Sequence, residues 1–238
     1  MSDFPYPGLR PFRRDETDIF FGREEHTDRL IDKLGKTRFL AVTGASGCGK
    51  SSLVRTGLVP ALEMGFLSTA GPLWKIAEMR PGNRPMLNLA TAISSALAPD
   101  DTKQGEITLP DAELIELRAA ILRRGPLGVK EILDTTPIPD GSNLLILVDQ
   151  FEEIFRYVQQ GGVDEADAFV DLLLESSRQT SHSIYIVITM RSDFLGDCSH
   201  FEQLPAAINE GQFLTPRLTR DQIRSAIEGP AGVFGGQH

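Results

Sequence analysis

Short apolar runs alternate along the chain with longer segments of helical periodicity. Five apolar runs bounded by turn residues are predicted as strands: 38–43, 73–79, 144–148, 183–189 and 212–214. Between them, apolar positions recur at helical spacing, which predicts helices over 22–34, 51–63, 87–97, 111–124, 152–158, 166–177 and 219–229. Strands that alternate with helices indicate a mostly parallel sheet with helices on both faces. The pattern therefore predicts one α/β domain.

Turn residues and spacing refine these elements. The arm over residues 4–12 contains three prolines and is expected to be extended, and 99–110 and 137–143 are expected to be loops. Thr219 and Gln222 match a capping box that opens the last helix, and Gly229-Pro230 is expected to end it. The helix over 111–124 is expected to bury an apolar face made of Leu114, Leu117 and Ile121.

Composition narrows the class of protein. Of 238 residues, 41% are hydrophobic and 24% are charged, which is typical of a folded domain and not of a disordered chain. The net charge of −9 disfavours non-specific attraction to nucleic acid or to anionic membranes. No apolar run approaches the roughly 20 residues that cross a bilayer, the first residues lack the charged and apolar regions of a signal peptide, and two cysteines exclude a disulfide framework. We therefore expect a cytoplasmic protein with no membrane partner.

A glycine-rich motif lies between the first predicted strand and the helix that follows. It matches the phosphate-binding loop pattern and consists of Gly44, Ala45, Ser46, Gly47, Cys48, Gly49, Lys50 and Ser51. Its glycines allow backbone N–H groups to face a phosphate at the positive end of the helix. We expect Lys50 to reach the β- and γ-phosphates, Ser51 to ligate Mg²⁺ and Ser52 to add a phosphate contact. The motif predicts nucleotide binding, with Cys48 as a small loop residue.

Asp149 ends the buried strand predicted at 144–148. Ligands of open α/β sheets gather at the carboxyl ends of the strands, and Asp149 is placed there as a Walker B acid that accepts from Mg²⁺-bound water. An aspartate after a strand is also typical of a cap on the next helix. The phosphate-binding loop in the same chain favours the Mg²⁺ role.

Hydrolysis also requires a group that positions or deprotonates water. Many P-loop ATPases have an acid directly after the Walker B aspartate, but this chain has Gln150 there. Glu152 and Glu153 follow in the first helical turn, and Glu152 is favoured as the base because it lies three residues beyond Asp149. Acidic residues are favourable at any helix N-terminus, so both glutamates have an alternative explanation. Slow hydrolysis and no hydrolysis both stay open.

Arg191 follows the strand predicted at 183–189. A strand inserted between the two Walker strands directs a polar residue at its end toward the γ-phosphate, and a guanidinium binds phosphate oxygens with two parallel donors. We therefore interpret Arg191 as a catalytic sensor of the γ-phosphate, with a surface ion pair to Asp193 as the alternative. The chain has no guanine-reading Asn-Lys-x-Asp motif, which favours ATP over GTP. Together, the motifs predict a three-layer P-loop NTPase fold of the additional-strand (ASCE, AAA-like) class.

Longer motifs in the chain resemble the novel STAND NTPase family, first subgroup, which comprises bacterial signal-transduction P-loop ATPases with numerous domains. The similarity extends from Pro5 to about residue 231. The motifs are Pro5-Tyr-Pro-Gly-Leu-Arg-Pro-Phe12, Phe20-Phe-Gly-Arg23-Glu24, Ser51-Ser-Leu-Val-Arg-Thr-Gly-Leu-Val-Pro60, Arg80-Pro-Gly82, Asp149-Gln-Phe-Glu-Glu153 and Arg191-Ser-Asp-Phe-Leu195.

The resemblance implies an ATP/ADP-operated switch in which nucleotide exchange permits oligomerisation and activates an effector, in bacterial stress or phage-defence signalling. Gly22 and Arg23 match a Gly-Arg motif that lies near the adenine and phosphates in related proteins, and Arg191 matches the sensor arginine. Arg23 is equally well explained as a helix-start residue paired with Glu24 or Asp28.

The same resemblance implies a domain organisation. We expect an extended arm over 1–22, a STAND-type ATPase domain over 23–231 and a tail over 232–238. Larger members continue into a winged-helix region and a repeat-based sensor, and this chain is expected to stop before them. Homo-oligomerisation or separate sensor and effector proteins would then complete the switch.

Three functions are compatible with the sequence. The favoured one is a Mg²⁺-dependent module that binds ATP or ADP and hydrolyses ATP slowly. The second is a non-catalytic nucleotide-binding scaffold that acts through protein–protein contacts, which Gln150 favours. A motor ATPase that acts on DNA is disfavoured by the acidic charge and by the lack of interleaved basic and aromatic residues.

Overall fold

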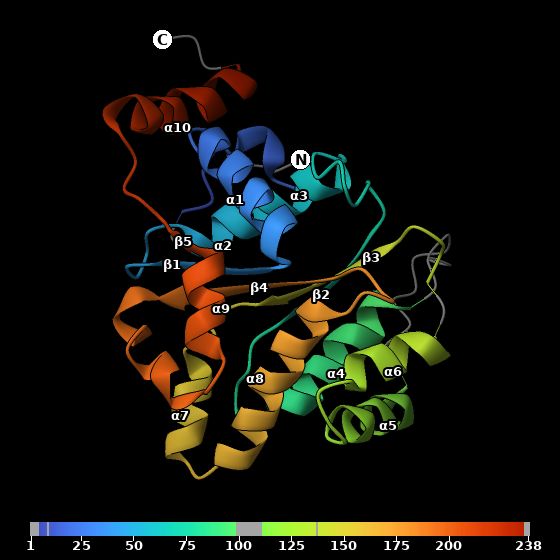
Figure 1. Ribbon diagram of the computed structural model, residues 1–238. Coiled ribbons are helices and arrows are strands. Elements are labelled where there is room, and N and C mark those ends of the chain that lie inside the picture. The colour runs from blue at the N-terminus through green and yellow to red at the C-terminus, as the bar shows by residue number, and fades with distance from the viewer. Residues whose placement is uncertain (1–4, 9, 99–110, 137, 236–238) are drawn as a thin grey trace.

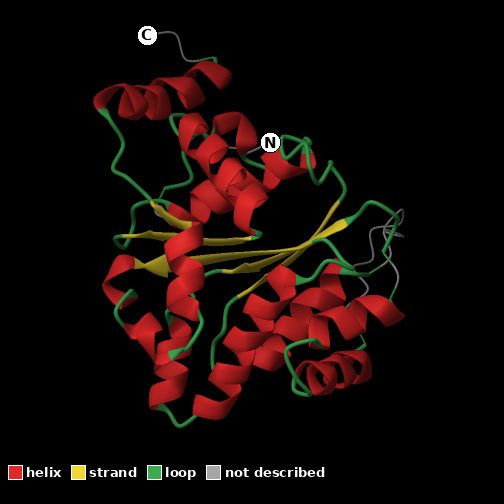
Figure 2. Cartoon of the chain, in the orientation of Figure 1, coloured by secondary structure: helices red, strands yellow, loops and turns green. Residues whose placement is uncertain are grey.

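A computed structural model describes residues 5–8, 10–98, 111–136 and 138–235. A central sheet lies between two layers of helices (Figures 1 and 2). The loop expected at 99–110, the first four residues of the arm and the last three residues of the tail lie outside the described residues. Within the described ranges, no helix is long and apolar enough to cross a membrane.

The sheet has five strands in the order β2-β3-β4-β1-β5, and every neighbouring pair is parallel. β4 therefore lies between β1 and β3, which confirms the inserted strand and the predicted fold class. The strands are β1 (Phe39–Gly44), β2 (Trp74–Met79), β3 (Asn143–Val148), β4 (Ile184–Arg191) and β5 (Gln212–Leu214). Because all strands are parallel, their carboxyl ends meet at one edge of the sheet.

Alternate residues of each strand face opposite helical layers. Leu40 and Val42 of β1 belong to a core shared with α1 and the helix after β1, whereas Ala41 belongs to the core on the other face. Both faces are covered, which explains why the central strands are almost entirely apolar. The helical elements are η1 (Thr17–Ile19), α1 (Glu24–Thr37), α2 (Lys50–Ser52), η2 (Leu53–Leu58), α3 (Val59–Glu63), α4 (Pro85–Ala96), α5 (Ala112–Leu122), α6 (Gly128–Thr135), α7 (Glu153–Gln159), α8 (Val163–Arg178), η3 (Ser192–Phe194), η4 (Asp197–His200), α9 (Leu204–Gly211) and α10 (Arg220–Val233).

The helix after β1 contains a π-helical segment. α2, η2 and α3 follow one another without interruption, and the Val59 N–H bonds to the Val54 carbonyl five residues earlier. Pro60 has no N–H to donate to Thr56, and its ring would crowd that carbonyl in a regular helix. The wider π turn just before Pro60 accommodates the proline without breaking the helix.

The structure corrects three expectations about helices. Leu114 and Leu117 are exposed, because α5 packs through Arg118, Ala119 and Leu122 instead. α6 and α9 were not predicted from the sequence. They are only eight residues each, so the periodic signal of each is short.

The last helix also continues past its expected end. α10 begins at the predicted capping box but runs through Pro230 to Val233. A Cβ at Gly229 would lie 2.5 Å from the ring of Phe21, so this ring packs directly against the helix backbone. Pro230 is buried as well. Packing against the N-terminal segment therefore overrides the local stop signal of Gly-Pro.

Candidate nucleotide-binding site

The loop from Gly44 to Lys50 curls around its own lysine. Gly47 and Gly49 have positive φ angles of 72° and 90°, a backbone conformation that favours glycine. The Lys50 ammonium donates to the carbonyls of Gly44 at 3.0 Å and Ala45 at 2.8 Å. The loop is thus a tight bend at the start of α2, as its sequence predicts.

Arg23 ties the loop to the segment between β5 and α10. Its guanidinium donates to the carbonyl of Cys48 at 2.9 Å and to that of Pro216 at 3.0 Å, and burial lowers its pKa. Arg23 is the N-cap residue of α1, as the helix-start alternative from the sequence expects, but no ion pair joins it to Glu24 or Asp28 among the described residues. In the structure, Arg23 holds backbone segments around the loop.

Gly22 has a packing role. Its φ is +81°, and a Cβ there would lie 2.4 Å from the backbone oxygen of Gln222 in α10. Only glycine fits this close approach without displacing the helix. The structure therefore brings Gly22 to α10 and not into the cavity beside the phosphate-binding loop.

Asp149 is the centre of a buried hydrogen-bond network. It is 1% exposed, and its Oδ1 accepts from the Ser51 hydroxyl at 2.7 Å and from the Thr189 hydroxyl at 2.6 Å. Thr189 in turn accepts from the Gln150 N–H at 3.1 Å. Gln150 itself has a φ of +56°, an uncommon conformation for a residue other than glycine. The first turn of α2, the end of β3 and the end of β4 thus meet at one carboxylate.

Two arginines bind the other oxygen of this carboxylate. Oδ2 of Asp149 lies 3.0 Å from Arg55 and 3.4 Å from Arg80. Burial by itself would raise the pKa of Asp149, but the hydrogen bonds from Thr189 and Ser51 and the two guanidinium charges outweigh it, and the pKa is lowered. The carboxylate is therefore held in its ionised form.

The two candidate bases have different environments. Glu152 is 7% exposed, lines the cavity beside the loop, and its Oε2 has no hydrogen-bond partner among the described residues. Glu153 instead accepts from the Gly82 N–H at 2.9 Å and lies outside that cavity lining. An unpaired buried carboxylate oxygen is costly unless a ligand or water completes its bonding. The structure thus separates two adjacent glutamates that the sequence leaves nearly equivalent.

Arg191 is the last residue of β4 and also lines the cavity. Its guanidinium forms an ion pair with Asp193 and lies over the ring of Phe194, with 5.6 Å between Cζ and the ring centroid. Both features proposed for Arg191 from the sequence are therefore present: the position at the strand end and the pair with Asp193.

Several of these residues line one cavity of about 470 Å³, whereas Asp149, Glu153, Gly22 and Arg23 are not among its lining residues. The loop contributes its later residues, while Gly44, Ala45 and Cys48 shape the bend from behind through the contacts to Lys50 and Arg23. The N-terminal arm forms a further wall, which the motifs do not indicate. The lining consists of Gly8, Arg10, Pro11, Phe12, Ser46, Gly47, Gly49, Lys50, Ser51, Ser52, Gln150, Glu152, Thr189 and Arg191.

Sequence reasoning did not assign seven residues that contact Asp149 or line the cavity: Gly8, Arg10, Pro11, Phe12, Arg55, Arg80 and Thr189. Two of them had a usable signal. Arg55 lies one helical turn after Ser51, and Thr189 is a polar residue within a buried apolar strand. No local signal pairs Arg80 or Arg10 with the site: Arg80 directly follows β2 and Arg10 belongs to the N-terminal arm, so only the tertiary fold brings them there.

The oxygen atoms at this edge suit a hard divalent cation. Ser51 and Asp149 lie in direct contact, and Mg²⁺ typically takes one or two protein oxygens together with phosphate oxygens and waters. Across the part of the chain that the structure describes, no three His, Cys, Asp or Glu side chains form a metal-binding group. The residues present therefore fit Mg²⁺ that arrives with a nucleotide.

Comparison with known families agrees with this geometry. The family model "Novel STAND NTPase 1" matches residues 5–238. The chain belongs to this family. The match covers the phosphate-binding loop, Asp149 and Arg191, and it confirms the resemblance inferred from the sequence motifs. No curated protein matches the chain.

Solved structures confirm the fold of this family member. It is similar to the Walker-type ATPase of Pyrococcus abyssi, with 18% identity and a TM-score of 0.53 over 97% of this chain and 63% of that one. Drosophila ORC bound to DNA has 15% identity and a TM-score of 0.52 over 98% and 54%. The Aeropyrum pernix ORC2 protein in its ADP form has 15% identity and a TM-score of 0.50 over 98% and 55%. The chain thus spans little more than half the length of these structures.

Proposed function

We propose that this STAND NTPase domain binds ATP with Mg²⁺ and hydrolyses it slowly, as the nucleotide-operated module of a signalling switch. The observation that carries the proposal is the meeting of the loop hydroxyl and the strand-end carboxylate: Ser51 and Asp149 are 98 residues apart in sequence and 2.7 Å apart in space. The Aeropyrum pernix ORC2 structure is an ADP form, which supports nucleotide as the ligand of this fold.

Each residue has a distinct part in the proposed reaction. The loop N–H groups and Lys50 bind the phosphates, with Lys50 exchanging its contacts to the Gly44 and Ala45 carbonyls for phosphate oxygens. Ser51 and Asp149 would hold Mg²⁺, which when bound neutralises charge that develops on the phosphates. Glu152 orients the attacking water with its unpaired oxygen and takes up its proton.

Arg191 and Arg23 are proposed as residues that respond to the nucleotide. Arg191 can exchange its exposed pair with Asp193 for a γ-phosphate oxygen, because an exposed ion pair is weak. Arg23 bonds to the phosphate-binding loop at Cys48 and to Pro216 in the segment before α10, so a movement of the loop would shift that segment and α10. We propose that oligomerisation or separate sensor and effector proteins read this change; the acidic net charge supports protein partners over nucleic acid.

Substitution of Lys50 by alanine tests nucleotide binding. Loss of one ammonium–phosphate contact is expected to weaken ATP binding by about 10- to 150-fold, measured by calorimetric titration in the presence of Mg²⁺. Lys36→Ala, an exposed lysine at the end of α1, is the matched control and should bind normally. Thermal unfolding of both variants without nucleotide identifies any loss of folding. Unchanged affinity in a folded Lys50→Ala variant would remove the proposal.

One measurement, the release of phosphate from bound ATP, distinguishes the scaffold alternative from the proposed enzyme. A scaffold binds ATP without consuming it, whereas the proposed enzyme releases phosphate in a reaction that depends on Glu152. Single-turnover release of phosphate from bound ATP separates the two functions, because it detects even slow hydrolysis.

A further inference from the structure

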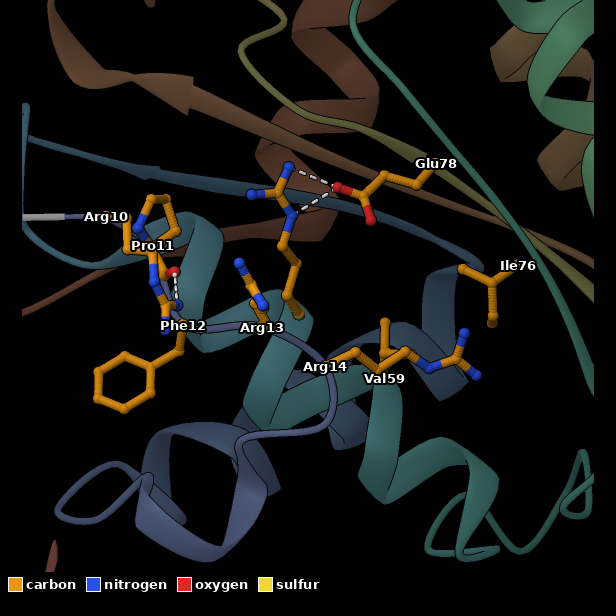
Figure 3. A pocket seen from close by; sticks show the side chains of 9 residues that line it. Arg10, Pro11, Phe12, Arg13, Arg14, Val59, Ile76 and Glu78 are labelled. Atoms are coloured by element: carbon orange, nitrogen blue, oxygen red, sulfur yellow. Dashed lines mark hydrogen bonds and ion pairs between the residues drawn. The ribbon is translucent and has the colours of Figure 1, made fainter. Parts of the chain in front are cut away.

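A second cavity of about 380 Å³ lies beside the N-terminal arm (Figure 3). It opens between the arm, the π-helical segment η2 with α3, and the edge strand β2. Four of its nine lining residues are arginines and only one is acidic. The lining consists of Arg10, Pro11, Phe12, Arg13, Arg14, Arg55, Val59, Ile76 and Glu78.

Three of the four arginines have acidic partners. Arg10 pairs with Glu16, whose pKa falls to about 2 mainly through that hydrogen bond. Arg14 pairs with Glu63.

Arg55 lies 2.5 Å from Glu78 and also reaches Asp149. The guanidinium of Arg13, in contrast, has no hydrogen bond or ion pair with any residue that the structure describes. Arg13 is an exposed residue whose charge also helps to lower the pKa of Glu16, and its guanidinium is open to a ligand from solvent.

The backbone around Arg13 is fixed in place. Its N–H donates to Glu16 at 2.7 Å, and its carbonyl accepts from the Thr56 hydroxyl at 3.0 Å. The preceding N–H, of Phe12, donates to Ser52 at 3.2 Å. Because these bonds hold the arm against the helix, an anion that binds Arg13 does not need to order the backbone first.

The remaining walls are apolar. Val59 and Ile76 face the cavity from α3 and β2, and Pro11 and Phe12 come from the arm (Figure 3). A cavity of this size with apolar walls and a few convergent charged groups is typical of a small-molecule site. The guanidinium without a direct partner favours a ligand with an anionic group, and the apolar walls favour a ligand whose remaining part is apolar.

We propose that this cavity binds a small organic anion, with its carboxylate or phosphate group on Arg13 and its apolar part against Val59 and Ile76. The site is distinct from the proposed nucleotide site, because none of the residues of the phosphate-binding loop lines it. The arm residues Arg10, Pro11 and Phe12 form the wall between the two cavities.

Titration with phenyl phosphate tests the proposal. The methyl NMR signals of Val59 and Ile76 report occupancy directly, and they are expected to shift saturably with a dissociation constant in the millimolar range or below. Arg13→Gln is expected to weaken this binding about tenfold or more. Arg224→Gln, which removes an exposed arginine of α10, is the charge-matched control and should bind as the native chain does.

Two further titrations distinguish binding at this cavity from binding elsewhere. In Lys50→Ala the affinity is expected to stay the same, so a failure of the nucleotide proposal would not affect this result. Benzyl alcohol, which has the ring without the charge, is expected to bind at least tenfold more weakly than phenyl phosphate. The proposal is overturned if the two methyl signals do not saturate, if Arg13→Gln binds as tightly as Arg224→Gln, or if the neutral alcohol binds equally well.

Discussion

At the scale of single residues, the ionised Asp149 has a partner at each of its oxygens. Two hydroxyls donate to one oxygen and two guanidiniums bind the other. Glu152 has the opposite character: it is almost as buried, yet one oxygen has no partner among the described residues. A carboxylate whose oxygens all have hydrogen-bond partners is held in a fixed orientation. A carboxylate with an unpaired oxygen can accept a hydrogen bond from an incoming water.

Glu152→Gln is therefore expected to abolish turnover while ATP still binds. The amide keeps the size of the side chain but cannot accept a proton, so single-turnover phosphate release should fall by about 10²- to 10⁴-fold. ATP affinity, measured by titration, should remain within about threefold of the native value, because Glu152 is not proposed to contact the phosphates.

Glu153→Gln provides the control at the neighbouring position. Its side chain bonds to the Gly82 N–H outside the cavity, and the amide oxygen can accept the same bond. Phosphate release should therefore stay near the native rate. Equal losses in the two variants would contradict the assignment of Glu152 as the base.

At the scale of elements, close backbone approaches position helices against the sheet. A Cβ at Gly211, the last residue of α9, would lie 2.2 Å from the backbone oxygen of Phe39 at the start of β1. A backbone oxygen within a strand cannot move aside as a flexible side chain can. α9 is thus held against β1 by a contact that only glycine permits.

Gly211→Ala is expected to destabilise the domain by about 1–3 kcal/mol, because the new methyl group overpacks this contact. Urea unfolding measures the change. Gly232→Ala in α10 is the matched substitution: a Cβ there meets nothing within 4 Å, and alanine favours the helix by roughly 0.5–1 kcal/mol. Opposite signs are expected for the two variants, and a loss of similar size in both would contradict the packing argument.

At the scale of the whole molecule, His26 links α1, β5 and the phosphate-binding loop. Its ring packs edge-on against Phe213, and Arg23 donates to its Nδ1 at 3.2 Å while also binding the loop. Burial lowers the pKa of His26, and the charge of Arg23 lowers it further. The folded domain therefore favours the neutral form of this histidine.

Because of His26, the free energy of unfolding of the domain is expected to decline as the pH falls below about 6.5, the ordinary pKa of histidine. In that range the unfolded chain binds a proton more readily than the folded chain does. The free energy of unfolding therefore falls by at most about 1.4 kcal/mol per pH unit. The carboxylates Glu16 and Asp149 have lowered pKa values, so their contributions are lost only at lower pH, below about 4.5. Urea unfolding between pH 5 and pH 7 therefore measures the stability above the range in which these two carboxylates contribute.

His26→Gln should flatten the stability curve in this window, whatever its effect at pH 7. His200→Gln serves as the control, because His200 is exposed and bonds only to a nearby backbone carbonyl. A slope that persists in His26→Gln would assign the acid sensitivity to other groups.

Local patterns predicted most of the architecture. The five strands, the capping box at Thr219 and the bend at Gly44–Lys50 all depend on residues that are close in sequence. The family motifs are equally contiguous, and the family match confirms them. The roles proposed for individual site residues remain predictions until nucleotide binding and turnover are measured.

By itself, the sequence determined the element pattern, the phosphate-binding loop and the family, because a backbone bend and an amphipathic period are properties of neighbouring residues. Only the tertiary structure decided which side chains surround Asp149, which of Glu152 and Glu153 faces the cavity, and which face of α5 is buried. The physical reason is strand order. Placing β4 between β1 and β3 brings together residues up to 98 positions apart, and no local pattern encodes that distance.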